Sequence, residues 1–154
     1  MGLIMTFEGE QDFPLSAAEL WPRLSDARFL VDCVPDAIVQ GQPEAVRAQC
    51  IVRPGFAFVR GSLDVTLEIA EARANELIRV VALSKGIGSR SEVEARLTIS
   101  DRDSGSRVHW QVEVKKLGGL LKAVPSGLIR GAAQKVIADM WTQTTLKLAE
   151  SSGK

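Results

Sequence analysis

Few side chains in this sequence are of the types that carry out acid–base, nucleophilic or metal chemistry. His109 is the only histidine, and the chain has no tyrosine. Cys33 and Cys50 have neither the spacing of a metal-binding pair nor that of a disulfide framework, so we expect them to be reduced and buried. Because no histidine lies near Cys33 in the sequence, we predict a packed thiol there and not a nucleophile. The sequence therefore predicts no transition-metal site, no catalytic residue and no cofactor.

Two other groups of residues have chemically useful types. Asp26, Asp32 and Asp36 are close in sequence, but helix capping and surface charge account for them better than a carboxylate cluster does. The segment KGIGS, from Lys85 to Ser89, holds a lone Gly-x-Gly without the strand-to-helix context of a phosphate-binding loop. We predict instead that these glycines let adjacent strands bend sharply.

The composition favours one folded domain over residues 1–154. Hydrophobic residues make up 45% of the chain, which argues against disorder. The 19 basic residues balance the 19 acidic ones, so the basic excess typical of nucleic-acid-binding proteins is missing. No apolar run approaches the roughly 18–20 residues of a membrane span, and the start has no signal-peptide pattern. We expect a cytoplasmic protein that meets a membrane at most peripherally.

The first third of the chain predicts a strand followed by two short helices. The strand opens the sequence, with apolar and polar residues alternating up to residue 13. Ser16 and Glu19 form a capping box at the start of the first helix, and Pro22 keeps that helix short or kinked. Asp26 can cap the second helix, which Pro35 ends.

The middle of the chain alternates with the period of β-strands. Strand-like segments follow one another at residues 37–40, 45–52, 56–70, 77–83, 93–99 and 108–114. The apolar parity switches across Gly61–Ser62, as a β-bulge would produce. The last two segments are the clearest, because each has one apolar and one polar face. His109 belongs to the polar face, which disfavours an acid–base role.

The C-terminal part changes to a helical period. Over residues 126–150, one apolar stripe consists of Ile129, Ala133, Val136, Ile137 and Met140, with Leu128, Ala132 and Trp141 beside it. An antiparallel sheet with one apolar face must bury it, and this helix is the only predicted element large enough. The sequence therefore predicts an α+β fold in which a strongly curved antiparallel sheet of about six to seven strands surrounds a long C-terminal helix.

This layout resembles the helix-grip fold of the START-like (SRPBCC) superfamily, and three segments resemble the CoxG-like family of carbon monoxide dehydrogenase subunits. In the first, residues 7–37, the family's mutual spacing is kept by Trp21, Leu24, Asp26, Cys33 and Pro35. Residues 59–69 resemble the family's Arg-Gly strand, and residues 127–148 resemble its C-terminal helix. Asp36 departs from the pattern, because the family usually has glycine after the proline. The resemblance covers nearly the whole chain.

The resemblance implies a cavity for a hydrophobic ligand between the sheet and the long helix. It also implies an accessory role around molybdenum hydroxylases without a chemical step, so that the partner would be such an enzyme or its maturation machinery. Some family members carry a tail beyond the helix that tethers them to a membrane. This sequence ends at Lys154, a few residues after the predicted helix, so the resemblance leaves the tethering role open.

We predict a cavity lined by apolar side chains, with the segment 19–37 as its rim or lid. The helix presents small residues that fill little space, at Gly127, Gly131, Ala132 and Ala133. Arg60 and Arg79 are candidates for turning inward to orient a polar head group. The complete predicted lining is Phe56, Phe58, Arg60, Arg79, Val93, Leu97, Trp110, Val112, Ile129, Ala133 and Met140. The predicted ligand is lipid-like or quinone-like and is held mainly by apolar burial.

Two other functions remain open at this point. A small cyclase- or dehydratase-type enzyme on the same fold would place Glu94, Arg60 or Asp64 in the cavity. Such an enzyme would need a buried carboxylate with a shifted pKa, and the alternation puts Glu94 outside. A protein-interaction module would instead have a closed core without room for a ligand.

Overall fold

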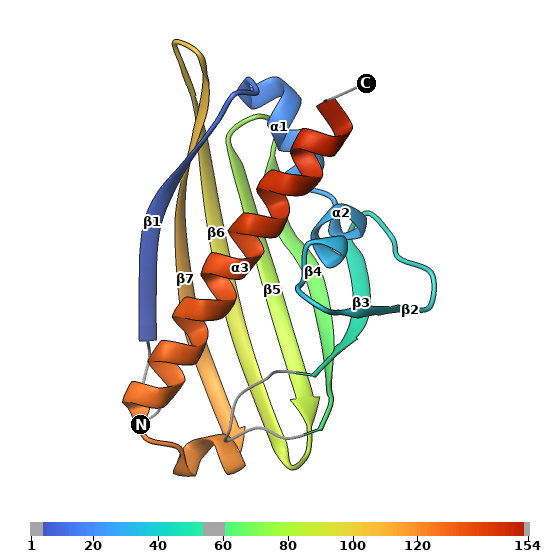
Figure 1. Ribbon diagram of the computed structural model, residues 1–154, viewed down its shortest axis with the longest axis vertical. Helices are drawn as coiled ribbons and strands as arrows, with labels where there is room; N and C mark the ends of the chain where they lie inside the picture. The colour runs from blue at the N-terminus through green and yellow to red at the C-terminus, as the bar shows by residue number, and fades with distance from the viewer. Residues whose placement is uncertain (1–4, 54–60, 153–154) are drawn as a thin grey trace.

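The computed structural model describes residues 5–53 and 61–152 of the chain (Figure 1). Within these ranges, seven strands form one antiparallel sheet in the order β1-β7-β6-β5-β4-β3-β2. A long C-terminal helix crosses one face of the curled sheet, and two short helices follow the first strand (Figure 1). The predicted α+β fold is confirmed.

The elements follow the predicted order along the chain. β1 (Met5–Phe13) leads into α1 (Ala17–Leu24) and α2 (Ala27–Asp32). The sheet continues with β2 (Ile38–Gln40), β3 (Arg47–Val52), β4 (Leu63–Arg73), β5 (Leu77–Gly86), β6 (Ser89–Arg102) and β7 (Gly105–Gly119). A 3-10 turn, η1 (Leu120–Ala123), then precedes the long helix α3 (Ser126–Ser152).

Both predicted N-caps are present on the short helices. The Ser16 hydroxyl accepts a hydrogen bond from the Glu19 backbone N–H at 3.2 Å, and the Glu19 carboxylate accepts one from the Ser16 N–H at 3.2 Å. The Asp26 carboxylate accepts from the Arg28 backbone N–H at 2.9 Å. Pro22 lies inside α1, which ends two residues later, so the prediction of a short helix is confirmed. Each cap satisfies a backbone donor that the helix itself leaves free.

The strand register divides the side chains between two faces of the sheet. In the β6–β7 pair, Val93 lies opposite Val114 and Leu97 lies opposite Trp110. These side chains share a face with the buried Leu67 and pack toward α3, so we call this the inner face. The alternating residues point to the outer face, and the predicted parity of β6 and β7 is therefore confirmed.

Two register shifts bend the sheet. The predicted bulge at Gly61–Ser62 is not part of a strand, because β4 begins at Leu63. The parity switch in the sequence instead marks where this strand starts. The register of β4 against β5 shifts between Ile69 and Glu71, and that of β6 against β7 shifts between Glu92 and Val93. Bulges increase the local right-handed twist, which helps the sheet to curl around α3.

The buried side chains form two clusters on the inner face. The larger cluster lies against α1 and α2 and includes Leu20, whose side chain is 0% exposed, together with Ile78. Complete burial of such a side chain contributes about 1.5–3 kcal/mol. The smaller cluster consists of Met5, Phe7, Val114 and Ile129, from the sheet edge and the first turns of α3. The inner face therefore holds two separate buried clusters, with partly buried side chains packed against them.

Candidate functional site

Between the two clusters, the inner face carries apolar side chains that stay partly exposed. We call this set the inner band; it consists of Val65, Ala82, Val93, Ala95 and Val112 on the sheet, with Ala133 and Ile137 on α3. Most of these side chains are small, and each packs against one of the clusters while keeping part of its surface exposed. The inner band is the part of the structure that corresponds to the predicted ligand site.

Most of the described residues of the predicted lining lie at the inner band or beside it. Val93, Val112 and Ala133 belong to the band, whereas Leu97 and Ile129 are buried in the flanking clusters. Trp110 contacts both clusters and so connects them. Met140 is half-buried on α3. The predicted lining residues Phe56, Phe58 and Arg60 lie outside the described residues.

Trp110 needs space that a glycine provides. A Cβ at Gly9 of β1 would lie 2.6 Å from Trp110 Cζ2, so the indole packs where only glycine leaves room. Trp110 also stacks at an angle on Trp141 of α3, with 6.3 Å between ring centroids. Its buried indole N–H has no hydrogen-bond acceptor among the described residues, and its Nε1 would lie 3.2 Å from a Cβ at Gly9. A buried donor without an acceptor is unfavourable, and this one lies against β1.

The small residues of α3 differ from the prediction. Gly127 and Gly131 are exposed, and a Cβ at either position would meet no atom within 4 Å. Because consecutive helical residues are separated by about 100°, Gly131 points away from the face that carries Ile129 and Ala133. Only Ala132 and Ala133 of the four predicted small residues are half-buried.

Arg79 and Glu94 lie on the outer face and not at the inner band. The Arg79 guanidinium donates to Glu94 at 2.8 Å and to Glu71 at 3.4 Å. Lys115 lies 3.2 Å from the same Glu94 carboxylate. The hydrogen bond from Arg79, followed by that from Lys115, lowers the pKa of Glu94 below its ordinary value. Arg79 therefore does not turn inward, because these carboxylates hold it outside.

The histidine also lies where the alternation predicts. His109 is 45% exposed on the outer face, and its Nε2 is 3.5 Å from a Glu8 carboxylate oxygen. Within the described ranges, no group of three or more His, Cys, Asp or Glu side chains is placed to hold a metal ion. The described helices include none that is both long and apolar enough to cross a membrane.

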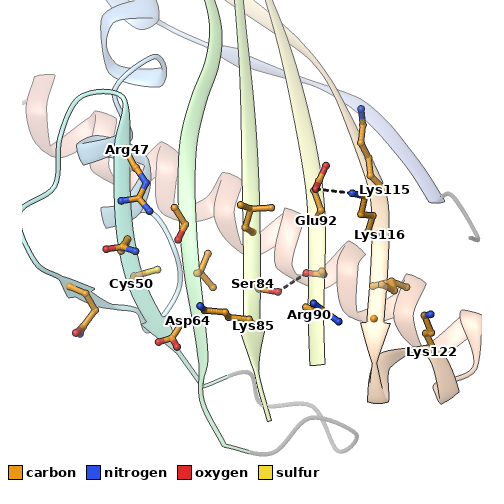
Figure 2. A pocket seen from close by; sticks show the side chains of 18 residues that line it. Arg47, Cys50, Asp64, Ser84, Lys85, Arg90, Glu92, Lys115, Lys116 and Lys122 are labelled. Carbon is orange, nitrogen blue, oxygen red and sulfur yellow. Dashed lines mark hydrogen bonds and ion pairs between the residues drawn. The ribbon is translucent and has the colours of Figure 1, made fainter. Parts of the chain in front are cut away.

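A shallow charged trough lies on the outer face and has a volume of about 1070 Å³. Figure 2 views it from the side of the sheet away from α3, which lies behind the strands. Six cations line it against the two acids Asp64 and Glu92; they are Arg47, Lys85, Arg90, Lys115, Lys116 and Lys122. The sequence reasoning missed this trough, because alternation along one strand does not show which charges meet across five neighbouring strands.

Three of the six cations already have acidic partners. Arg47 pairs with Glu68 at 3.5 Å, Lys116 with Glu92 at 3.8 Å, and Lys115 with Glu94. Across residues 5–53 and 61–152, the ion pairs include none of Lys85, Arg90 and Lys122. The cations that form no ion pair among the described residues therefore lie at one end, where β5, β6 and η1 meet, with Asp64 beside Lys85 (Figure 2).

The predicted lid is part of the core. Within the segment 19–37, the side chains of Leu24, Ala27, Val31 and Cys33 are buried. The Trp21 indole N–H donates to the Leu77 carbonyl of β5 at 3.2 Å. A smaller hollow of about 440 Å³ separates residues 32–37 from α3, and its lining includes Asp36, Asp139 and Lys147. The segment therefore closes one end of the inner face.

A seven-stranded antiparallel sheet curled around a long C-terminal helix, with short helices after the first strand, defines the START-like (SRPBCC) class of helix-grip proteins. Within that class, residues 9–149 match the model of the CoxG family of carbon monoxide dehydrogenase subunits. The chain belongs to this family. No curated protein matches the sequence significantly.

Solved structures share the fold at low sequence identity. A conserved protein from Geobacillus kaustophilus superposes with a TM-score of 0.79 at 17% identity, and the match covers 97% of each chain. The protein Ms6760 from Mycobacterium smegmatis has a TM-score of 0.64 at 13% identity, covering 95% of this chain and 92% of that one. For the AHSA1 protein from Silicibacter pomeroyi the TM-score is 0.63 at 12% identity, covering 96% and 99%. These likenesses show the fold alone.

Proposed function

We propose that this protein is a non-enzymatic module that binds a lipid-like or quinone-like molecule at the inner band. Membership of the CoxG family supports a ligand-binding accessory role in general. The finer proposal is that the protein serves a molybdenum hydroxylase or a carbon monoxide dehydrogenase-type system, or its maturation machinery. The partial exposure of the inner band beneath α3 is the observation that carries the ligand-binding proposal.

The physical argument rests on apolar surface that the fold itself leaves uncovered. The inner band exposes aliphatic side chains between two buried clusters. Covering such surface gains about 25 cal/mol per Å², which is offset by the costs of association. Within the described residues, the side chains of the inner band itself carry no polar atom. An apolar surface with few polar groups suits a ligand with a long hydrocarbon part and a small polar head.

The geometry offers less to the enzyme alternative. That alternative requires a carboxylate at the inner face, held in its protonated form by burial. Glu94 and Asp64 both lie on the outer face, and ion pairing lowers the pKa of Glu94. Among the described residues, the buried polar side chains are those of Ser89, Ser106 and Thr144, and none of them is an acid.

The test is to fill the inner band and measure ligand-dependent stability. Ala133→Phe adds a large side chain from α3 into the band. Thermal unfolding is followed with a panel of fatty acids, quinones and isoprenoids, after native mass spectrometry of the protein as expressed. A ligand at about 100 times its dissociation constant stabilises the wild type by roughly 2.7 kcal/mol. The Ala133→Phe variant loses this shift and keeps a melting temperature near that of the wild type.

Ala138→Phe is the matched control, because Ala138 is exposed on the other side of the same helix. This variant should keep the ligand-dependent shift. In a dry, close-packed core, Ala133→Phe would instead overpack and cost about 1–3 kcal/mol. A destabilised Ala133→Phe variant, beside a wild type that no apolar ligand stabilises, would reject the proposal and favour a closed-core interaction module.

A further inference from the structure

The turn between β5 and β6 has a backbone that its sequence does not favour. Ile87 has a φ of 55° and Gly88 a φ of 67°, so both central residues of this tight hairpin are left-handed. Such turns prefer Asn-Gly, because the branched Cβ of isoleucine crowds the backbone in this region. Ile87 is nevertheless present, and its side chain is 43% exposed. The residue is strained and also uncovered.

The same hairpin pairs two like charges in its register. Lys85 and Arg90 are direct partners in the β5–β6 register, and both point to the outer face. Lys85 is also the partner of Asp64 in the β4–β5 register, and Figure 2 shows its side chain extending toward Asp64, whereas Arg90 has no acidic strand partner. Arg90 also lies along the next strand, where a Cβ at Gly118 would be 3.3 Å from its Nε. The absence of a side chain at Gly118 gives the guanidinium this position.

The 3-10 turn η1 adds a second exposed apolar residue and a third cation at the same end of the sheet. Its residue Leu120 is 64% exposed, and the Leu120 N–H donates to the Gly88 carbonyl at 2.9 Å. Lys122 of η1 lines the trough together with Lys85 and Arg90 (Figure 2). Figure 1 shows the β5–β6 turn and η1 at the end of the sheet opposite α1. We call the five residues Lys85, Ile87, Arg90, Leu120 and Lys122 the basic tip.

We propose that the basic tip docks on the surface of an anionic lipid bilayer. Ile87 and Leu120 enter the interface between headgroups and acyl chains, while Lys85, Arg90 and Lys122 contact lipid phosphates. Charge complementarity carries this choice of partner, because these three cations form no ion pair within the described structure. Docking of this kind needs no ligand at the inner band and stands apart from the proposed function.

The arrangement fits a bilayer better than an acidic protein. Ile87 and Leu120 project from two turns and do not form a broad apolar patch. A protein interface needs a packed apolar core, whereas shallow insertion into lipid needs only exposed apolar tips beside cations. The lysine and arginine stems also allow the charged ends to stay in the headgroup layer.

Vesicle flotation of the full chain tests this proposal. The wild type should bind vesicles of phosphatidylcholine mixed with phosphatidylglycerol, and it should not bind phosphatidylcholine alone. Each cation near an anionic surface contributes a factor of about 5, so Lys85→Gln/Arg90→Gln should weaken the partition by about 25-fold. Ile87→Asn/Leu120→Gln should also weaken it, and the binding that remains should be more sensitive to salt.

The matched control removes two arginines from the far end. Arg73→Gln/Arg102→Gln makes the same change in net charge at turns next to α1, and it should bind vesicles like the wild type. Circular dichroism checks that every variant is folded. The proposal is overturned if the wild type does not bind the anionic vesicles, or if the two double cation variants lose binding equally. Binding to soluble polyglutamate but not to these vesicles would overturn it in favour of an acidic protein partner.

Discussion

Residues of the same kinds lie in opposite environments at the two ends of this molecule. At the end that carries α1 and α2, leucine is buried, helix ends are capped, and Arg28 lies 2.7 Å from the Asp26 carboxylate. At the basic tip, leucine is exposed, the turn residue is strained, and two cations are partners in the strand register. The local sequence favours the observed conformation at the first end and disfavours it at the second.

This contrast separates residues that serve folding from residues that serve another purpose. A natural sequence is expected to be locally consistent with its fold, and its exceptions concentrate at functional sites. One exposed leucine would mean little, since much protein surface is apolar. Strain at Ile87, the register pairing of Lys85 with Arg90, and exposure of Leu120 occur within one small region. That coincidence makes the basic tip the better candidate for a function outside folding.

The largest expected effect comes from truncating one leucine at each end. Leu20→Ala removes a side chain that is fully buried between α1 and the sheet, so it should lower the free energy of unfolding by about 2–5 kcal/mol. Leu120→Ala should change it by less than about 0.5 kcal/mol, since this side chain is already in water. Urea unfolding of both variants measures the difference. Equal losses would show that the tip is packed as tightly as the core.

The next effect has the opposite sign. Ile87→Asn places at the β5–β6 turn a residue that tolerates the left-handed conformation, which isoleucine occupies at a cost of roughly 1–2 kcal/mol. The free energy of unfolding should therefore rise by about 1 kcal/mol, while vesicle binding falls. Chemical denaturation measures the first change. An unchanged or lowered stability would mean that contacts of Ile87, such as the one with Gly61, outweigh the strain.

A smaller gain is expected from removing one of the two cations paired in the β5–β6 register. Arg90→Gln removes the cation opposite Lys85, but Asp64 already lies opposite Lys85 on β4, so the free energy of unfolding should rise by no more than about 0.5 kcal/mol. The gain should shrink as salt is added, because salt screens charges at the surface. Urea melts at low and high ionic strength measure both effects. A gain that does not depend on salt would point to packing against Gly118 as its cause.

A further small effect concerns acid sensitivity on the outer face. Arg79 holds the pKa of Glu94 below its ordinary value of 4.5, so the unfolded chain binds the proton more readily than the folded one. The stabilisation is complete above about pH 4.5 and is lost as the pH falls through the lower folded pKa. Glu94→Gln should flatten this part of the stability curve by less than about 1 kcal/mol, since the ion pair is near the surface. Urea melts at neutral and at acidic pH check it.

Asp12 and Asp26 limit how much Glu94→Gln can flatten the curve. Hydrogen bonds from Arg107 and Arg28, respectively, lower the pKa of these two carboxyl groups as well. The variant should therefore keep part of its acid sensitivity. A complete loss of pH dependence in Glu94→Gln would contradict this account of the outer face.

The sequence predicted the features that depend on neighbouring residues. The capping box needs only Ser16 and Glu19, and the faces of β6 and β7 follow from simple alternation, so both are confirmed. The exposed position of Gly131 could also have been predicted, since a residue two places from Ile129 lies about 200° around the helix. That angle places Gly131 on the exposed side and not against the sheet.

The charged trough depends instead on contacts between distant segments. Lys85 and Arg90 are close in sequence, but their meeting with Lys122 requires the order of the strands and the return of the chain through η1. The outward position of Arg79 could not be predicted for the same reason, because its partner Glu94 comes from another strand. Periodicity assigns a side chain to a face but does not say which charges share that face.

The placement of the tryptophans gives the protein its own optical reporter. Trp110 and Trp141 lie in contact beside the inner band, whereas Trp21 is held at α1 by its bond to the Leu77 carbonyl. A quinone bound at the band would quench the first two emitters, which lie beside it. With Trp21 replaced by phenylalanine, the whole fluorescence signal would come from the band. Occupancy of the inner band by a ligand could then be measured from intrinsic tryptophan fluorescence, without labelling the chain.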